Sequence, residues 1–320
     1  MTAVFDVSDF LHPLDLSARQ HLEGIPLLQV AVKRYLGSVT DRRDRQWLLA
    51  SAVRLGPRQL PDIYRMLPPI CDAFGIHPEP ELYLMRGEAN AITMGHSRPA
   101  ILIFNQLLED LAEDEIQAVL AHECGHILAE HILYRQMARA LTRAGQAGGV
   151  LGSGLVKAAT SVATSQLQAA LINWYRKSEL TADRAAAGYL RDAQPMQRAL
   201  FHLCGLPAYA PADVSYTAFL EQAEEFDQVA DSSWWNRYLS RGVEKSGMTH
   251  PIPALRIREV TVWTQSDNFR QLVGIAELGH SEERLRCAQC GQEVATAWRF
   301  CQRCGGPVPQ EVVSQTGVES

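Results

Sequence analysis

One short segment of this sequence carries side chains suited to binding a metal ion and activating water. In AHECGHILAEH, His122 and His126 are four residues apart, so on a helix both imidazoles project from one face. That spacing suits two nitrogen ligands of a tetrahedral zinc ion. Glu123, next to the first ligand, is close enough to take a proton from a water at the metal. The remaining residues are mostly apolar, which favours a buried helix over a surface helix with incidental histidines.

A catalytic zinc site needs a third protein ligand, and Glu179 in RKSELTADRAA is the best candidate. Asp183 follows at i+4 on the same helix face, where it can accept a hydrogen bond from a ligand histidine and fix its tautomer. Such a pair also occurs on solvated helices, but its alanine neighbours favour close packing. The rival ligand is His131. On a continuous helix it lies about 140 degrees around from His126, so we expect a structural or outer-shell role for it.

Cysteine chemistry at this segment is not expected. Cys124 lies about 200 degrees around the helix from His122 and should face the core, away from the metal. Cys71 and Cys204 are likewise isolated in the sequence, and we expect each to be a small buried hydrophobe.

Four further cysteines form a separate metal-binding pattern near the C-terminus. Cys287, Cys290, Cys301 and Cys304 make two CxxC pairs on either side of GQEVATAWRF. Two such knuckles supply four thiolates in a tetrahedron and leave no open position, so the pattern predicts a structural zinc site. It resembles a zinc ribbon with GQEVATAWRF as the intervening hairpin, and the metal would supply much of the folding energy. A rubredoxin-like iron centre is the alternative.

The elements around these residues predict an α+β fold: a mainly helical domain with a small β-sheet, plus the ribbon. Apolar periodicity favours helices before Phe74, and LYLM and AILIF indicate two or three strands after it. Glu109 to Arg143 and a long segment ending in SELTADRAAAGYL are expected to be helical. We predict an N-terminal helical region at 1–75 packed on a catalytic domain at 76–265. A linker at 266–284, the ribbon at 285–309 and a disordered tail at 310–320 complete the expected organisation.

Composition excludes several classes of protein. The 320 residues are 47% hydrophobic and 21% charged, and the net charge of -6 argues against a nucleic-acid partner. The acidic start does not match an export signal, so we expect a cytoplasmic protein. Ala147 to Ile172 comes nearest to a membrane span, but polar residues interrupt it and favour a closely packed helical pair. This leaves peripheral membrane contact open, and no pattern predicts an oligomeric state.

Several motifs together resemble the HtpX-like and CAAX-prenyl-protease group of gluzincin metallopeptidases. They are EANAITMG, AILIFNQLLEDLAEDEIQAVLAHECGHILAEH, SELTADRAA and THPIPALRI, in that order between about Pro80 and Val260. The resemblance implies zinc ligands His122, His126 and Glu179, with Glu123 as general base and Asp183 as an outer partner. It also implies that Asn90 and Ala91 lie on an edge strand that pairs with extended substrate. His250 and Arg256 would line the site, with His250 helping to stabilise the oxyanion. Many family members carry obvious membrane-spanning helices, whereas this chain shows none.

The leading hypothesis is therefore a zinc-dependent endopeptidase that hydrolyses extended or unfolded protein segments. The alternative is a binding protein on a peptidase scaffold, with weak or latent hydrolysis and a partner recruited by the ribbon. A zinc-ribbon nucleic-acid factor has little support, because the basic residues are sparse.

Overall fold

The computed structural model describes residues 5–23, 39–135, 155–204, 215–229 and 253–274, together with 285–286, 288–291 and 293–294. The chain divides into two compact units, Met1–Ser266 and Asp267–Ser320. The helices of the first unit are η1 (Val7–Asp9), α1 (Pro13–Glu23), α3 (Val39–Ser51), α4 (Pro61–Phe74), α5 (Asn105–Asp110), α6 (Glu113–Leu128), α8 (Leu155–Leu190), α9 (Gln194–His202), α10 (Tyr216–Val229) and α13 (Pro253–Thr264). Its strands are β1 (Val53–Arg54), β2 (Glu81–Met85), β3 (Ala91–Met94) and β4 (Ala100–Phe104).

The strands form one mixed sheet in the order β1-β2-β4-β3. β2 and β4 are parallel, and the two outer strands pair antiparallel with them. Ile101, Leu102 and Ile103 of β4 are fully buried, as a continuous apolar run predicts for a central strand. The α+β class is confirmed, but the helical expectation for residues 1–75 missed β1, whose two exposed residues carry no alternating pattern.

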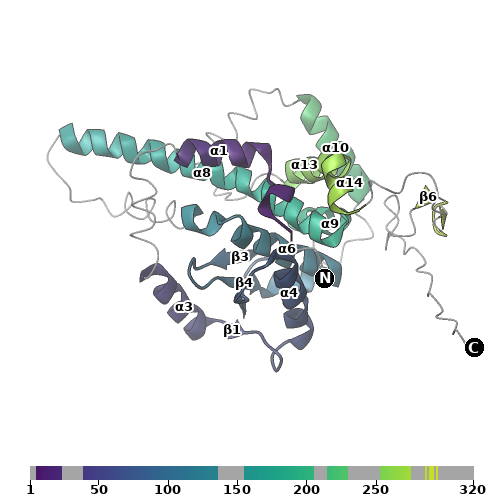
Figure 1. Ribbon diagram of the computed structural model, residues 1–320, viewed down its shortest axis with the longest axis horizontal. Helices are drawn as coiled ribbons and strands as arrows, with labels where there is room; N and C mark the ends of the chain where they lie inside the picture. Colours follow the sequence, from purple (N-terminus) through teal and green to yellow (C-terminus); the bar gives the residue numbers. More distant parts are fainter. Residues whose placement is uncertain are drawn as a thin grey trace, which may run out of the picture. The chain divides into compact units, whose positions relative to one another are not determined.

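α6 and α8 pack side by side and bring the HExxH and ExxxD motifs together (Figure 1). Three acidic residues in the first turn of α6 favour a helix start there, because they complement the positive end of the helix dipole. The close approach depends on Gly125: a Cβ at that position would lie 2.8 Å from the Cβ of Ala185 and 3.3 Å from the Cα of Ala182. The small residues of both motifs therefore set the distance at which their polar side chains meet.

One helical prediction needs correction. The region 109–143 is interrupted after α6, at a turn over 129–130 where Glu130 adopts a φ of 57°; a new helical segment follows at 131–135. Residues 155–172 belong to helix α8 and residues 147–154 lie outside the described part, so the helical pair expected at 147–172 stays a prediction. Among the described residues, no helix combines the length and hydropathy needed to cross a membrane.

The second unit contains α14 (Asp267–Leu272) and the antiparallel strands β5 (Leu285–Arg286) and β6 (Glu293–Val294). β6 lies in GQEVATAWRF, and it pairs with a strand that precedes the first CxxC pair, so this hairpin spans that pair. The remainder of the predicted intervening hairpin, at 295–300, lies outside the described residues, as do Cys287, Cys301 and Cys304. Cys290 is half-buried in the turn between the two strands.

Candidate active site

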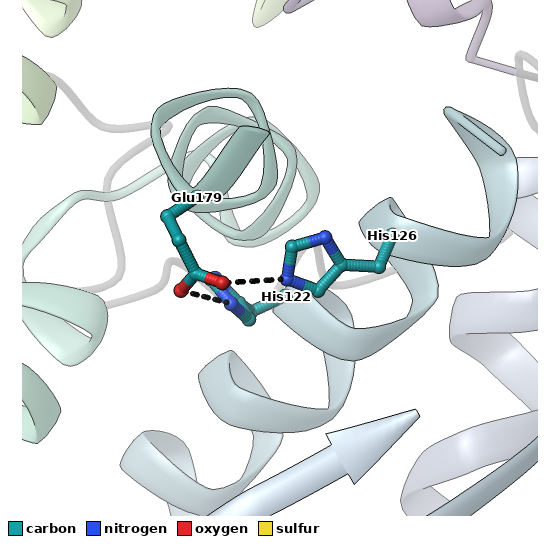
Figure 2. Close-up of side chains that lie close together, drawn as sticks. All are labelled: His122, His126 and Glu179. Atoms are coloured by element: carbon teal, nitrogen blue, oxygen red, sulfur yellow. Dashed lines mark ion pairs between the residues drawn. The ribbon is translucent and has the colours of Figure 1, made fainter. Parts of the chain in front are cut away.

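Three side chains from two helices converge on one point in the first unit. His122 and His126 project from α6, and Glu179 reaches them from α8 (Figure 2). The Nε2 atom of His122 lies 3.5 Å from Oε2 of Glu179, and that of His126 lies 3.3 Å from Oε1. Ligands about 2.0–2.1 Å from a tetrahedral zinc ion are about 3.3 Å apart, so these separations fit a zinc-sized cation. All three residues are buried, and their ligand atoms lie within 4.8 Å of one another.

His122 is oriented through its second ring nitrogen. Its Nδ1 lies 2.9 Å from Oδ1 of Asp183, one turn beyond Glu179 on α8. Burial lowers the pKa of His122, but hydrogen bonds to Asp183 and Glu179 outweigh burial and raise that pKa to about 9. The carboxylates that favour a proton at this ring also favour a metal cation. Because Nδ1 donates its hydrogen to Asp183, Nε2 is the nitrogen that can bind a metal at the shared centre, where the cation takes the place of the Nε2 proton.

Asp183 and Glu179 in turn share Arg256 of α13. The Nε and Nη2 atoms of Arg256 donate to the two oxygens of Asp183 at 2.8 and 2.6 Å, and Nη1 lies 3.3 Å from Oε2 of Glu179. Burial alone would raise the pKa of Asp183, but Arg256 and His122 hold it below its usual range. Arg256 is itself 5% exposed. Arg256 thus contacts two of the carboxylates at the site, and its predicted place along the substrate site stays a prediction.

His126 lies against His131, and here the sequence argument was wrong in its geometry. The continuous helix assumed for residues 109–143 would turn His131 away, but the break at Glu130 returns its ring to His126. The two Nδ1 atoms lie 2.8 Å apart. Burial lowers the pKa of His126 to about 4, although Glu179 opposes the shift, so the ring is neutral at pH 7. His131 thus contacts a candidate ligand, and the structural or outer-shell role expected for it stays a prediction.

Glu123 lies next to His122 on α6 and faces the sheet. The hydroxyl of Thr93, on strand β3, donates to Oε2 of Glu123 at 2.5 Å. Thr93 and Glu123 are 1% and 4% exposed, so this hydrogen bond holds the Glu123 carboxylate in an environment that solvent hardly reaches. The sequence argument missed Thr93, although it lies inside EANAITMG, because a threonine in a short strand carries no distinguishing signal.

The remaining predicted residues fall in different places. Cys71 is buried, as expected, but Cys204 is exposed, so the prediction of a buried residue there was wrong. Cys124 is fully buried away from the ligand cluster, and burial together with the Cys71 thiol raises its pKa, so it stays a thiol. Ala91 begins β3, one of the two edge strands of the sheet as described, and Asn90 immediately precedes it. The carbonyl of Asn90 accepts a hydrogen bond from the amide of Phe104. His250 lies outside the described residues.

Two histidines from one helical turn and a glutamate from a following helix define the HExxH-plus-glutamate class of metallopeptidase. The profile of Peptidase family M48 matches residues 57–264, more than half of the chain, and the chain belongs to that family. It is 33% identical to "Plastoglobule-localized metallopeptidase 48, chloroplastic" of Arabidopsis thaliana over 271 residues, which cover 84% of this chain and 76% of that protein. The chain is accordingly a zinc metallopeptidase, a hydrolase of peptide bonds.

More distant relatives match a smaller part of the chain. "Protease HtpX homolog" of Janthinobacterium sp. (strain Marseille) is 26% identical over 150 residues, 40% of this chain and 52% of that protein. The chain thus spans about half the length of this bacterial relative. The crystal structure of S. mikatae Ste24p aligns with a TM-score of 0.38 at 17% identity, covering 77% of this chain and 60% of that one. That score is too low to assign the fold in detail.

Proposed function

We propose that His122, His126 and Glu179 hold the catalytic zinc ion and that Glu123 is the general base. The observation that carries this proposal is the convergence of both Nε2 atoms on one buried carboxylate, at separations that fit tetrahedral zinc. Zinc bound there would act as a Lewis acid that polarises the scissile carbonyl and acidifies water.

The residues around the metal site then have separate roles in the reaction. Glu123 accepts a proton from the attacking water and later returns it to the leaving amine. Thr93 holds the Glu123 carboxylate in one orientation, so that proton transfer starts from a fixed geometry. Asp183 and Arg256 are positioning residues: they fix the ring of His122 and the carboxylate of Glu179, and neither touches the reacting atoms.

Substrate recognition is proposed to use strand addition at β3, beginning at Asn90 and Ala91. The outermost strand of a sheet can pair with an extended peptide, a mode that selects extended backbone more than side-chain identity. Ala91 is 5% exposed, so an added strand would have to displace the neighbours that cover it. By family resemblance, His250 is proposed to stabilise the oxyanion. Extended or unfolded protein segments are the expected substrates.

A second, structural zinc is proposed at Cys287, Cys290, Cys301 and Cys304, with a zinc ribbon at 285–309. The β5–β6 hairpin around the first cysteine pair supports this assignment, because a knuckle between two short strands is typical of a ribbon. The domain organisation expected from the sequence remains part of the proposal, with the ribbon as a module for docking substrate or partner. A cytoplasmic location and the absence of a nucleic-acid partner stay predictions. The Arabidopsis relative is named for the chloroplast and the plastoglobule, and that location is a property of that protein.

Replacing all four C-terminal cysteines with serine separates the peptidase from the adaptor alternative. We expect about one zinc ion per chain to remain, because the helical site uses no thiolate. The purified variant should still cleave an unfolded casein-type protein, lose that cleavage to a chelator and regain it with added zinc. Loss of all zinc with the cysteines, and no cleavage by either form, would favour an adaptor whose metal is confined to the ribbon.

A further inference from the structure

A carboxylate from the N-terminal helix lies at the end of a hydrogen-bonded chain that leads to the zinc site. Asp15 belongs to α1, outside residues 57–264 that the family profile matches. It is 1% exposed, and its Oδ2 lies 3.1 Å from Nε2 of His131. A charged group so deeply buried is costly unless other groups compensate it. The burial of Asp15 and its contact with His131 therefore indicate that this carboxylate has a specific role.

Oδ2 of Asp15 also links α1 to α8, the helix that carries Glu179. The hydroxyl of Thr181, two residues beyond Glu179, donates to Oδ2 of Asp15 at 2.6 Å. The Thr181 hydroxyl oxygen also accepts a hydrogen bond from the backbone amide of His12, just before α1 begins, at 3.1 Å. Asp15 is thus held from two sides, by α8 through Thr181 and by the segment after α6 through His131.

Only one assignment of protons satisfies the whole chain of contacts. The Nε2 of His126 faces Glu179, so binding a metal there places the ring hydrogen on Nδ1. The Nδ1 of His131, 2.8 Å away, must then be the acceptor, and its own hydrogen sits on Nε2. That Nε2 donates to Asp15. Each ring nitrogen of His126 and His131 is therefore a donor, an acceptor or a metal ligand. The Asp15 carboxylate can only accept a hydrogen bond, and this fixes the donor in each bond back to His126.

We propose that Asp15 and His131 are positioning residues for the zinc ligand His126, so that α1 completes the metal site. The proposal rests on the proposed function, in which His126 binds zinc. It gives the two ligand histidines parallel support: Asp183 orients His122 directly, and Asp15 orients His126 through an intervening imidazole. Outer partners of this kind raise the basicity of a ligand ring and restrict its rotation, and their loss weakens metal binding.

The test is metal affinity and not activity alone. It uses the full-length chain with the four C-terminal cysteines replaced, so that thiolate-bound metal does not interfere. Asp15→Ala should weaken zinc binding, measured by competition with a chelator, by about 10- to 100-fold and should alter the visible spectrum of the cobalt-substituted protein. Asp15→Asn keeps an acceptor oxygen for His131, so its effect should be smaller than that of Asp15→Ala.

A matched control removes a different contact of the same N-terminal segment. Glu259 of α13 lies 3.2 Å from Nε2 of His12, next to α1, and takes no part in the chain to His126. Glu259→Gln should loosen this attachment but leave zinc affinity and the cobalt spectrum unchanged. Equal loss of zinc in Glu259→Gln and Asp15→Ala would overturn the proposal, because docking of the helix alone would explain both.

Two further outcomes are decisive. If Asp15→Ala does not fold, Asp15→Asn decides: the proposal fails if this variant folds with unchanged zinc affinity and an unchanged cobalt spectrum. His126→Ala separates this proposal from the proposed function. If His126→Ala loses zinc and Asp15→Ala does not, only the role of Asp15 is wrong. If His126→Ala itself keeps wild-type zinc affinity, the ligand assignment is wrong.

Discussion

Replacing Glu123 with glutamine should abolish measurable proteolysis while the protein keeps its zinc. The substitution preserves the shape of the side chain and an oxygen that can accept from Thr93, but the amide cannot take a proton from water. General base catalysis contributes about 10²- to 10⁴-fold, so kcat on an unfolded test protein should fall by that factor. Metal content, measured on the same preparation, should equal that of the wild type, because Glu123 is not among the three ligands.

The control for this variant removes a carboxylate from the same helix. Glu113→Gln changes an exposed residue in the first turn of α6 and should leave kcat and metal content unaltered. Cleavage by Glu123→Gln at the wild-type rate would show that another group accepts the proton. Loss of zinc from Glu123→Gln would assign its effect to the metal site instead of to proton transfer.

Replacing Arg256 with methionine should be the most destabilising change near the site. Arg256 makes two hydrogen bonds to Asp183 and an ion pair with Glu179, and all three residues are at most 5% exposed. Methionine fills the space of the side-chain stem but leaves two buried carboxylates without their cation. Breaking a buried ion pair from one side costs about 3–5 kcal/mol, so the free energy of unfolding measured by denaturant titration should fall by that amount.

Two comparisons identify the ion pair as the cause. Arg256→Met combined with Asp183→Asn should be less destabilised than the sum of the two single variants, because the double variant no longer leaves that carboxylate buried and ionised. Arg258→Met, on the same helix but half-exposed, should cost no more than about 1 kcal/mol, as surface pairs do. An equal effect at both arginines would mean that loss of helix packing explains the result.

The three residues that meet at the candidate metal site could be chosen from the sequence because the information is local. The i, i+4 spacing of His122 and His126 and of Glu179 and Asp183 places each pair on one helix face whatever the rest of the chain does. The apolar run AILIF likewise indicated a strand, and its lack of polar positions agrees with the central, buried place that β4 takes in the sheet. The glycine and alanines between the polar residues are part of the same local signal, because they allow α6 and α8 to approach closely.

What the sequence does not predict depends on contacts between distant residues or on one backbone torsion. His131 was expected to point away from His126 because the helix was assumed to continue, and a single positive φ at Glu130 reverses that outcome. Asp15 is 116 residues from His131, and no periodicity in α1 distinguishes it from an ordinary first-turn acid. Arg256 was expected in the site by resemblance, but its pairing with Asp183 and Glu179 follows only from the packing of α13 on α8.

The most direct test of the metal site is the set of atoms bound to zinc when the four C-terminal cysteines are absent. X-ray absorption at the zinc edge on that variant should give a shell of nitrogen and oxygen alone, at about 2.0–2.2 Å, with imidazole scattering from two histidines. Sulfur in that shell, or a spectrum unchanged when Glu179 is replaced by alanine, would contradict the assignment of His122, His126 and Glu179 as the zinc ligands.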